Sequence, residues 1–313
     1  MKRELMRSLH IAALAVFTLT TASIAADADT PAARAICALS TDTTYSGGAH
    51  TIFQGTDVWR GSGTPDTSIG PMWSWPVGTI YGGGYGLFAT NAQTGDIYRW
   101  SDGGGNGIWR GSWNRIGGPG AEFAITADGL YGLTPDRGAV YRYTGIGSAW
   151  TRFSGPAEHI YGGNFGLLAT GRLTGDAYRV LPDGMHRIGG PGAEFVVTDH
   201  SIYGLTPNRQ AVYRYTGTSW TRIGGPAAHI YAGGGTDQIL ATAPSAGDVY
   251  RYFATTGSWE RIGGPGATFT ITDDGVVYGL TTNHRSIWRY SGTGTSWTKV
   301  SRDDEIRTIA ACP

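Results

Sequence analysis

A short motif recurs along this chain and constrains its fold more than any other feature. The motif is an aliphatic residue, an aromatic residue and Arg, and the Arg-to-Arg spacings are 39, 43, 37, 35, 37 and 38 residues. Its copies are Val58-Trp59-Arg60, Ile97-Tyr98-Arg99, Val140-Tyr141-Arg142, Ala177-Tyr178-Arg179, Val212-Tyr213-Arg214, Val249-Tyr250-Arg251 and Ile287-Trp288-Arg289. One further copy, Ile108-Trp109-Arg110, lies out of register, and we interpret it as an insertion. A fixed period of this length is typical of solenoids and propellers.

Each unit contains four short runs of residues that alternate in part between apolar and polar. From Glu122 the runs read EFAITADG, LYGLTPDRG, AVYRYTGIGSA and WTRFSG. Gly, Asp and Pro separate them, so we predict four strands joined by tight turns. The fourth run opens on Trp113, Trp150, Trp220, Trp259 or Trp297, and Met185 replaces this Trp in one unit. Repeated units of four antiparallel strands predict a β-propeller, whereas a β-sandwich does not explain seven equal units.

The composition agrees with many short strands and turns. The chain has 51 Gly and 14 Pro among 313 residues, together with 11 Trp, 17 Tyr and 9 Phe. This Gly content excludes a helix bundle, because each Gly costs about 1 kcal/mol in a helix interior. The aromatic content excludes a disordered chain, and no three-residue Gly repeat indicates collagen.

The two ends of the chain together predict a closing blade. Ile306–Cys312 supplies one more first strand. The other three strands of that blade are predicted at residues 36–40, 57–60 and in a run near 68–73. The expected fold is therefore an all-β, seven-bladed propeller of four-stranded antiparallel blades, closed by a composite N- and C-terminal blade. Cys37 and Cys312 are the only cysteines, and this register places them on neighbouring strands. In an exported protein we expect them to form a disulfide bond.

The N-terminus has the pattern of a secretory signal peptide. Lys2, Arg3 and Arg7 precede a mostly apolar stretch that ends in small residues at Ala25 and Ala26. The alternative is a membrane anchor, but threonines interrupt the apolar run. We predict a signal peptide over residues 1–26 and a single propeller domain over residues 27–313. The mature protein is expected to be secreted, to the outside or to a periplasm if the host has an outer membrane.

The charge of the expected mature chain is close to neutral. Removing residues 1–26 takes away three basic residues and Glu4, which leaves 21 basic and 23 acidic residues. Such a balance provides no electrostatic attraction for nucleic acid or an anionic membrane. We therefore expect neither nucleic-acid binding nor membrane insertion, and the oligomeric state stays open.

The units also alternate in pairs. The first strands near Thr79, His159 and His229 read TIYGG, HIYGG and HIYAG. Those near Glu122, Glu194 and Thr268 instead read EF or TF, then further apolar or β-branched residues and an Asp turn. The sequence therefore predicts three copies of an unlike pair of blades, plus the composite blade.

Residues 113–297 resemble the tectonin and tachylectin-type propellers. The motifs that carry the resemblance are W-x-R-I-G-G-P, then L-Y-G-L-T-P, then V-Y-R-Y. The resemblance implies a secreted lectin that binds glycans or glycoconjugates at repeated sites. The sequence departs from the family in its GGP turn and in the alternation of unlike blades.

The topology predicts that polar side chains gather on one face of the ring. In a four-stranded meander, the turn between the second and third strands lies on the same face as the link to the next blade. Sugar recognition uses planar polar groups that form bidentate hydrogen bonds, and weak single sites gain from multivalency. The candidate sugar-binding residues on this face are Glu122, Asp136, Arg137, His159, Arg172, Glu194, Asn208, Arg209, His229, Asn283, His284 and Arg285. We interpret Arg137, Arg209 and Arg285 as equivalent residues that recur in three blades.

Structural roles are the alternative for each of these residue types. Asp and Asn are common in tight turns because they bond their own backbone. The Trp residues of the fourth strands are expected to pack within or between blades. Arg142 and its equivalents are expected to stack on aromatic rings or to pair with acids, and the two His residues could form structural hydrogen bonds.

No motif of an enzyme is present. The chain lacks H-E-x-x-H and G-x-S-x-G, and Gly82–Gly84 and Gly103–Gly105 lack the setting of a phosphate loop. Asp303-Asp304-Glu305 is interpreted as a solvated loop rather than a cation site. We expect no catalytic residue, cofactor or metal. The alternatives are a protein-binding or structural scaffold, and a glycan- or lactone-directed enzyme with a single unlike site.

Overall fold

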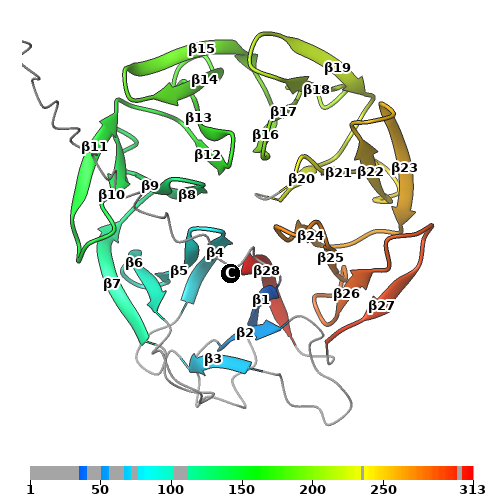
Figure 1. Cartoon of the computed structure of the whole chain (residues 1–313), viewed down its shortest axis with the longest axis horizontal. Helices are drawn as coiled ribbons and strands as arrows, with labels where there is room; N and C mark the ends of the chain where they lie inside the picture. The colour runs from blue at the N-terminus through cyan, green and yellow to red at the C-terminus, as the bar shows by residue number, and fades with distance from the viewer. Residues whose placement is uncertain are drawn as a thin grey trace, which may run out of the picture.

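The computed structural model describes residues 35–40, 51–55, 67–71, 77–101, 112–233, 236–301 and 305–312. The predicted signal peptide, the motif copies at residues 58–60 and 108–110, and the acidic residues 303 and 304 lie outside the described residues. Figure 1 shows the described strands arranged in sheets around a common centre.

Six four-stranded antiparallel blades follow one another in chain order. Blade 1 consists of β4 (Val77–Gly83), β5 (Gly86–Asn91), β6 (Asp96–Ser101) and β7 (Ser112–Pro119). Blade 2 consists of β8 (Glu122–Thr126), β9 (Gly129–Leu133), β10 (Val140–Tyr143) and β11 (Trp150–Ser154). Blade 3 consists of β12 (Ile160–Gly163), β13 (Gly166–Thr170), β14 (Asp176–Leu181) and β15 (Gly184–Pro191).

The next three blades repeat this order. Blade 4 consists of β16 (Glu194–Val197), β17 (Ile202–Leu205), β18 (Val212–Tyr215) and β19 (Trp220–Gly224). Blade 5 consists of β20 (Ile230–Ala232), β21 (Ile239–Thr242), β22 (Val249–Phe253) and β23 (Ser258–Gly263). Blade 6 consists of β24 (Thr268–Ile271), β25 (Val277–Leu280), β26 (Ile287–Tyr290) and β27 (Trp297–Lys299). In each blade the first strand lies nearest the centre of the ring (Figure 1). The predicted propeller is confirmed.

A further sheet joins the two ends of the described chain. It contains β28 (Ile306–Cys312), β1 (Ala35–Ser40), β2 (Thr51–Gly55) and β3 (Thr67–Pro71) in that order, and we call it the terminal sheet. The strand that pairs with β1 is β2, at residues 51–55, and not the predicted run at residues 57–60. The pairing of β1 with β28 places Cys312 opposite Ala35 and Cys37 opposite Ala310. This sheet is consistent with a closing seventh blade.

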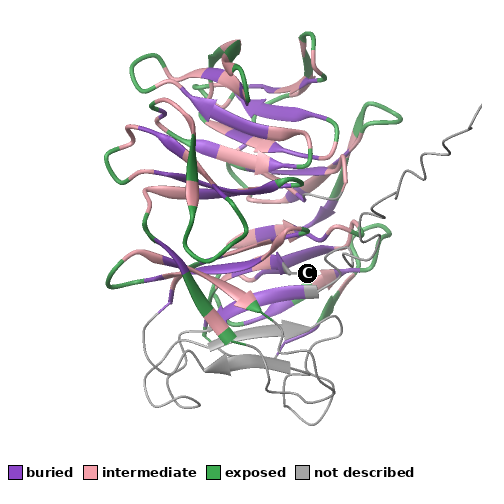
Figure 2. Cartoon of the chain, turned by 60° about the vertical axis from the view of Figure 1, so that its left-hand side comes forward, coloured by how far each residue is buried: buried purple, intermediate pink, exposed green. Residues whose placement is uncertain are grey.

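The hydrophobic core lies between the blades. Each core cluster of the described residues combines side chains from two neighbouring sheets. One cluster, for example, packs Tyr131 and Leu133 of blade 2 against Ile160 and Leu167 of blade 3. The terminal sheet takes part in two clusters, one with blade 1 and one with blade 6. Buried residues accordingly concentrate in the inner three strands of each blade, while exposed residues lie in the turns and along the fourth strands (Figure 2).

Glycines permit the close approach of the innermost strands. A Cβ atom added at Gly162 of β12 would overlap the backbone carbonyl of Ile125 in β8. Gly163 has the same relation to Val197, and Gly233 to Ile271. The second glycine of the IYGG motif, which is kept in IYAG of blade 5, is therefore required in blades 3 and 5, where the first strand of one blade meets the first strand of the next.

In blades 2, 4, 5 and 6, a Trp in the fourth strand ties the blade to the preceding one. The indole Nε1 of Trp220 in blade 4 donates to the carbonyl of Ile188 in blade 3, over 2.7 Å. Trp150, Trp259 and Trp297 donate in the same way to Ile116, Ile223 and Ile262, at 2.7, 2.8 and 2.6 Å. The predicted packing role of these Trp residues is confirmed, and it includes a hydrogen bond that crosses the blade boundary.

The Arg of the recurring motif holds the turn between the first two strands. Arg142 lies over the ring of Tyr131, with its Cζ 5.9 Å from the centroid, and donates to the carbonyl of Asp128. Arg179 lies over Phe165 in the same way, at 4.3 Å. Arg214 pairs with Asp237 of the next blade. The predicted stacking and pairing of these residues is confirmed.

The Trp–carbonyl bond is expected to contribute measurably to stability. The substitution Trp220→Phe removes the indole N–H and keeps an aromatic ring, so we expect the free energy of unfolding to fall by about 1–3 kcal/mol. Urea unfolding of the purified chain measures the change. Trp288→Phe is the matched control, because Trp288 is 36% exposed and should cost less. Equal losses in the two variants would contradict a structural role for the Trp220 bond.

Candidate functional site

The links between blades and the turns between second and third strands lie on one face, which we call the link face. Glu122 opens β8 on this face, and three groups converge on its carboxylate. His159 Nδ1 lies 2.5 Å from Glu122 Oε1, and Arg137 Nη1 lies 3.4 Å from the same oxygen. The backbone N–H of Ile160 donates to Oε2 over 2.9 Å. The structure therefore brings three predicted residues together across the boundary between blades 2 and 3.

The same arrangement recurs between blades 4 and 5. His229 Nδ1 lies 3.3 Å from Glu194 Oε2, and Arg209 Nη1 lies 3.6 Å from that oxygen. Arg209 also donates to the carbonyl of Ala228. Burial raises the pKa of Glu194, although His229 and Arg209 act in the opposite direction. Two of the three unlike blade pairs thus carry the same Glu–Arg–His cluster.

The third unlike blade pair has other residues at the positions of the Glu–Arg–His cluster. Thr268 occupies the place of the glutamate, and His284 occupies the place of Arg137 and Arg209. The backbone shows this equivalence, because Arg137, Arg209 and His284 have φ values of 59°, 58° and 59°. The predicted equivalence of Arg285 with Arg137 and Arg209 is therefore wrong by one residue, and the equivalent position is His284. His284 Nδ1 donates to the carbonyl of Ile306, over 3.1 Å.

The other predicted turn residues bond mainly to their own turns. Asp136 Oδ1 accepts from the Thr134 hydroxyl at 2.6 Å and from the Gly138 N–H at 3.0 Å. Asn208 and Asn283 accept in the same way from Thr206 and Thr281, at 2.8 and 2.7 Å. The hydrogen bond from Thr134 is the main cause of the lowered pKa of Asp136, and the charge of Arg172, which is exposed in the turn of blade 3, acts in the same direction. The turn interpretation thus accounts for the contacts of these Asp and Asn side chains.

The Glu–Arg–His clusters bind neighbouring blades to one another. The carbonyl of Arg137 accepts from the N–H of Ala157, and that of Arg209 accepts from Ala227, at 3.2 and 3.1 Å. Three partners within the protein engage the Glu122 carboxylate, which leaves it little bonding capacity for a ligand. The buried Glu194 Oε2 makes no hydrogen bond within the described residues and lies at ion-pair distance from His229 and Arg209. Burial also raises the pKa of Tyr161 and Tyr231 to about 12, so the phenols beside these clusters stay protonated at neutral pH. The clusters are suited to holding blades together.

Aromatic pockets recur in the grooves between blades, beside the links. The pocket of blade 2 is lined by the link Gly118–Gly120 and by Phe123, Tyr141 and Trp150, and has a volume of about 140 Å³. The pocket of blade 6 is lined by Gly264–Gly266, Phe269, Trp288 and Trp297, and measures about 210 Å³. The pocket of blade 5 is lined by Gly224–Ala227, Tyr250 and Trp259, and measures about 310 Å³.

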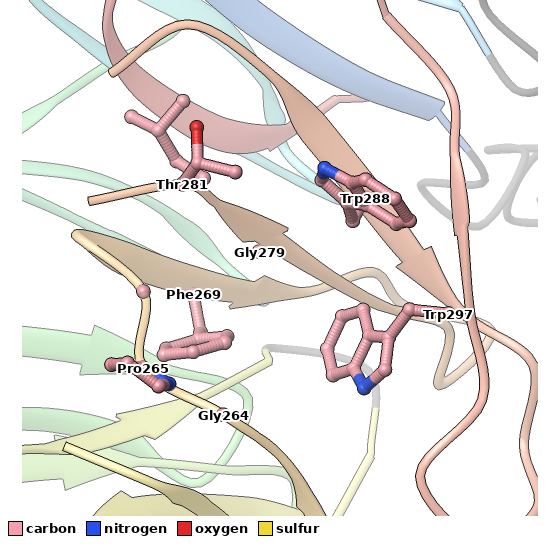
Figure 3. A pocket seen from close by; sticks show the side chains of 9 residues that line it. Gly264, Pro265, Phe269, Gly279, Thr281, Trp288 and Trp297 are labelled. Carbon is pink, nitrogen blue, oxygen red and sulfur yellow. The ribbon is translucent and has the colours of Figure 1, made fainter. Parts of the chain in front are cut away.

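Figure 3 shows the pocket of blade 6 from close by. The rings of Trp288 and Trp297 stand on one side, Phe269 and the link at Pro265 lie on the other, and Gly279 leaves space between them. The hydroxyl-bearing Thr281 lies at the edge. The walls are therefore mostly aromatic, with backbone groups as polar partners, because the Thr281 hydroxyl is engaged by Asn283 and by backbone N–H groups of its own turn.

The glycines of the link and of the second strand create these pockets. A Cβ atom at Gly120 would lie 2.7 Å from Phe123 Cζ, and one at Gly132 would lie 2.9 Å from Phe123 Cε1. Gly266 and Gly279 have the same relation to Phe269, at 2.7 and 2.8 Å. A side chain at either position would displace the ring that forms the inner wall.

The aromatic residues of these pockets were not predicted as site residues from the sequence. Tyr141, Tyr250 and Trp288 belong to the motif that defines the repeat, and the fourth-strand Trp residues were interpreted as packing alone. A signal was present, because the third strands of five of the six blades carry two aromatic residues two positions apart, on the same face of the blade. Tyr143 is buried whereas Tyr141 is half-buried, so only one of the pair is available to a ligand.

A central cavity of about 330 Å³ lies among the innermost strands. Glycine backbone and mostly apolar side chains of several blades line it, with Asn164 and Asp273 among the polar members. Within the described part of the chain, no group of three or more His, Cys, Asp or Glu residues could hold a metal ion. In the same residues, no helix is long and apolar enough to cross a membrane.

Blades 1, 3 and 5 each contain an Asp–Arg ion pair between the third and fourth strands. The guanidinium of Arg115 meets Asp96 at 2.8 Å in blade 1, that of Arg187 meets Asp176 at 2.8 Å in blade 3, and that of Arg261 meets Asp248 at 2.7 Å in blade 5. Hydrogen bonding from the guanidinium lowers the pKa of all three aspartates. Blades 2, 4 and 6 have Ala139, Ala211 and Ser286 in place of the aspartate. The unlike blades therefore differ in charge as well as in sequence.

Comparison with known proteins identifies the fold and no family. No protein-family model matches the chain, and no curated protein matches it in sequence. The structure of apo AztD from Citrobacter koseri is similar, with a TM-score of 0.55, 9% identity, and coverage of 88% of this chain and 96% of that chain. A putative 6-phosphogluconolactonase from Bacteroides fragilis is similar with a TM-score of 0.53, 12% identity, and the same coverage of 88% and 96%. A chain of a nidogen/laminin complex has a TM-score of 0.46 and 14% identity, and covers 70% of this chain and 95% of its own length. At these identities, the first two similarities show a shared propeller fold alone.

The three Asp–Arg pairs are expected to make stability depend on pH in the acid range. Because the pKa of each aspartate is lower in the folded protein than its usual 3.8, the pairs stabilise the fold at neutral pH. This contribution is lost as the pH falls below about 4. In the variant D96N/D176N/D248N, the free energy of unfolding should fall less between pH 7 and pH 3 than in the wild type. Urea unfolding at the two pH values measures this, and R115Q/R187Q/R261Q should behave alike. An unchanged pH dependence in both variants would contradict the assignment.

Proposed function

We propose that this chain is an exported lectin-like propeller that binds glycans at repeated sites on its link face, without catalysis. The observation that carries the proposal is the recurrence of one aromatic pocket, at equivalent positions, in blades 2, 5 and 6. An enzyme is expected to concentrate its polar groups in a single unlike site, whereas a lectin repeats a modest site. The proposal that the ligand is a glycan rests on the chemistry of the pockets.

The pockets suit a sugar ring. A pyranose has one face of C–H groups and a rim of hydroxyls, so it needs an aromatic surface and a few hydrogen-bond partners. Tyr141 or Trp288 supplies the surface, and the backbone groups of the Gly-Pro-Gly link supply hydrogen-bond partners at the same pocket. The volumes of about 140–310 Å³ lie at or below the lower limit of pockets for drug-sized ligands, about 300 Å³. A single sugar ring is the ligand class that such small, open sites favour.

Repetition compensates for the weakness expected of each site. A small pocket with few hydrogen-bond partners gives low affinity for one ring, but several pockets on one rigid face can engage a surface that displays many copies of that ring. The effective concentration of the second contact then raises the overall affinity by about 10²–10⁴ without any new contact. The ligand expected on this basis is a polyvalent glycan or glycoconjugate.

The polar clusters predicted from the sequence have a supporting role in this proposal. Glu122 and Glu194 are engaged by Arg and His partners across blade boundaries, which fixes the relative positions of the blades that form the pockets. A protein-binding or structural scaffold is the alternative from another class. It would use the same face through one large partner, and a glycan screen separates the two functions.

The proposal includes a ring of seven blades, closed by the terminal sheet and fastened by a disulfide between Cys37 and Cys312. Support comes from the pairing of β1 with β28, from the packing of the terminal sheet against blades 1 and 6, and from the absence of a free cysteine among the described residues. Oxidation of the pair accords with the proposed export, because disulfides persist outside the cytosol.

Removing the third-strand aromatic residue of each pocket is expected to weaken glycan binding. A glycan array first identifies ligands of the mature protein. The variant Y141A/Y250A/W288A should then bind the strongest ligand about tenfold or more weakly, since each pocket loses its stacking surface. The control Y85A/F165A/F253A removes three half-buried aromatics of the opposite face and should bind as the wild type does. Loss of binding in both variants, or in neither, would contradict the pockets as the sites. Binding to no glycan, together with one tight protein partner in a pull-down, would favour the scaffold.

Opening the proposed disulfide is expected to weaken the ring without preventing its formation. Because the crosslink would close a loop of more than 270 residues, Cys37→Ala should lower the free energy of unfolding by about 4–5 kcal/mol. Cys312→Ala should cost about as much, and the double variant little more than either alone. Urea unfolding of the three variants measures this. Additive losses in the double variant would indicate two independent side chains and would contradict the crosslink.

A further inference from the structure

One aromatic position distinguishes blade 6 from the other described blades. Trp288 occupies this position in the third strand of blade 6 and is 36% exposed. The pocket beside it is lined by three aromatic rings, two of them indoles, from Phe269, Trp288 and Trp297 (Figure 3). We call these three residues the aromatic cage. The equivalent residues in blades 1 to 5 are all tyrosines, namely Tyr98, Tyr141, Tyr178, Tyr213 and Tyr250.

Packing in the core holds two of the three rings in place. Phe269 and Trp297 have ring centroids 6.2 Å apart and planes inclined by 58°. Trp297 also packs against Tyr290, with centroids 5.3 Å apart, and its indole N–H donates to the carbonyl of Ile262 over 2.6 Å. The inner part of the aromatic cage is therefore preformed, and the exposed ring of Trp288 completes it from outside.

The pocket of blade 6 offers a ligand few hydrogen-bonding side chains. The Thr281 hydroxyl is engaged within its own turn, and the indole N–H of Trp297 is engaged by the preceding blade. Pro265, at the middle of the link, has no N–H group to donate. Among the lining side chains, the indole N–H of Trp288 is the donor that remains. A ligand therefore meets mainly aromatic rings and backbone groups of the link.

This surface suits a cation that does not need hydrogen bonds. The face of an aromatic ring is negative and attracts a cation, most strongly when the ring is Trp. Within the described part of the chain, no charged side chain lines the pocket. Lys299 lies opposite Trp288 on the neighbouring strand, but it does not line the pocket and has an interaction partner of its own.

The number of N–H groups on the cation then decides which cation fits. A primary ammonium group is strongly hydrated and carries three donors, each of which loses a water partner when the group enters an apolar pocket. A fully methylated ammonium group has the same charge and no donor, and its methyl groups can pack against the rings. The aromatic cage is therefore expected to prefer the methylated ion.

We propose that the pocket of blade 6 binds a quaternary ammonium group of the choline type, enclosed by Phe269, Trp288 and Trp297. This inference deepens the proposed glycan-binding function and rests on it for the carrier, because the group is taken to be a substituent of the glycan. The pockets of blades 2 and 5 have one indole each, from Trp150 and Trp259, and keep the plain sugar ring as their ligand. Blade 6 thereby adds selectivity for a cationic substituent to a face whose other pockets bind neutral rings.

Three small probes separate the effect of the charge from that of the methyl groups. They are choline, an uncharged analogue of choline in which carbon replaces the nitrogen, and ethanolamine. Saturation-transfer NMR with the folded protein measures each affinity, and choline is expected to bind about three- to tenfold more tightly than either of the others. Choline should also shift the indole N–H signal of Trp288, which is assigned by its absence in Trp288→Phe. Equal affinity for choline and its uncharged analogue would overturn the proposal.

Variants of one residue assign the preference to the aromatic cage. Trp288→Leu keeps an apolar side chain and removes the ring, so choline should bind no more tightly than the uncharged analogue. Trp288→Phe keeps a ring and should retain part of the preference. The control Tyr178→Leu changes the equivalent residue of blade 3, where Met185 replaces the fourth-strand Trp, and should leave choline binding unchanged. Thermal unfolding establishes that each variant is folded. A full preference for choline in Trp288→Leu would overturn the assignment.

The carrier of the ammonium group is tested separately. Dextran that carries choline groups should bind the wild-type protein more tightly than plain dextran, and free choline should displace it. Sedimentation with phosphatidylcholine vesicles, without binding to choline-bearing dextran, would overturn a glycan as the carrier. If the glycan array yields ligands but choline does not bind, this inference fails and the glycan-binding function stands. If choline binds and neither the array nor the dextrans do, the glycan-binding function fails and the aromatic cage is supported.

Discussion

The contact between adjacent blades is the interaction on which the rest of this structure depends. A single four-stranded sheet has two faces to cover, and each core cluster of the described residues combines side chains from two neighbouring sheets. The Trp indole that donates to a carbonyl of the preceding blade adds direction to this apolar contact. Packing alone would let blades slide, whereas a buried N–H that requires its acceptor fixes their relative position.

The pockets follow from this way of joining blades. The chain leaves the outer strand of one blade and crosses to the inner strand of the next through a glycine-rich link. Gly120 and Gly132 bring this link and the second strand so close to Phe123 that no side chain fits between them. The space left between the link, the ring of Phe123 and the fourth-strand Trp is the pocket. A structural requirement of the ring therefore creates a repeated apolar hollow, and ligand specificity depends on the few residues at its edge.

Much of the architecture could be predicted from the sequence. The spacing of the recurring motif predicted four-stranded units, and the matching runs at the two termini predicted that β28 and β1 would pair. Turn chemistry also indicated the roles of Asp136 and Asn208, whose side chains bond their own turns. The errors were local. The strand beside β1 lies at residues 51–55, and His284 rather than Arg285 is the equivalent of Arg137, because the left-handed backbone position and not the residue type defines the equivalence.

The sequence by itself determined the period, the order of the strands and the alternation of unlike blades, because these depend on local features: apolar alternation, turn residues and glycine positions. Only the tertiary structure decided which side chains share a site. It engaged Glu122, Arg137 and His159 with one another, and it gathered Phe269, Trp288 and Trp297 around an open space. The physical reason is that a pocket forms where the faces of several strands converge beside the link from the neighbouring blade. That convergence is set by the packing of sheets around the ring, which no single stretch of sequence contains.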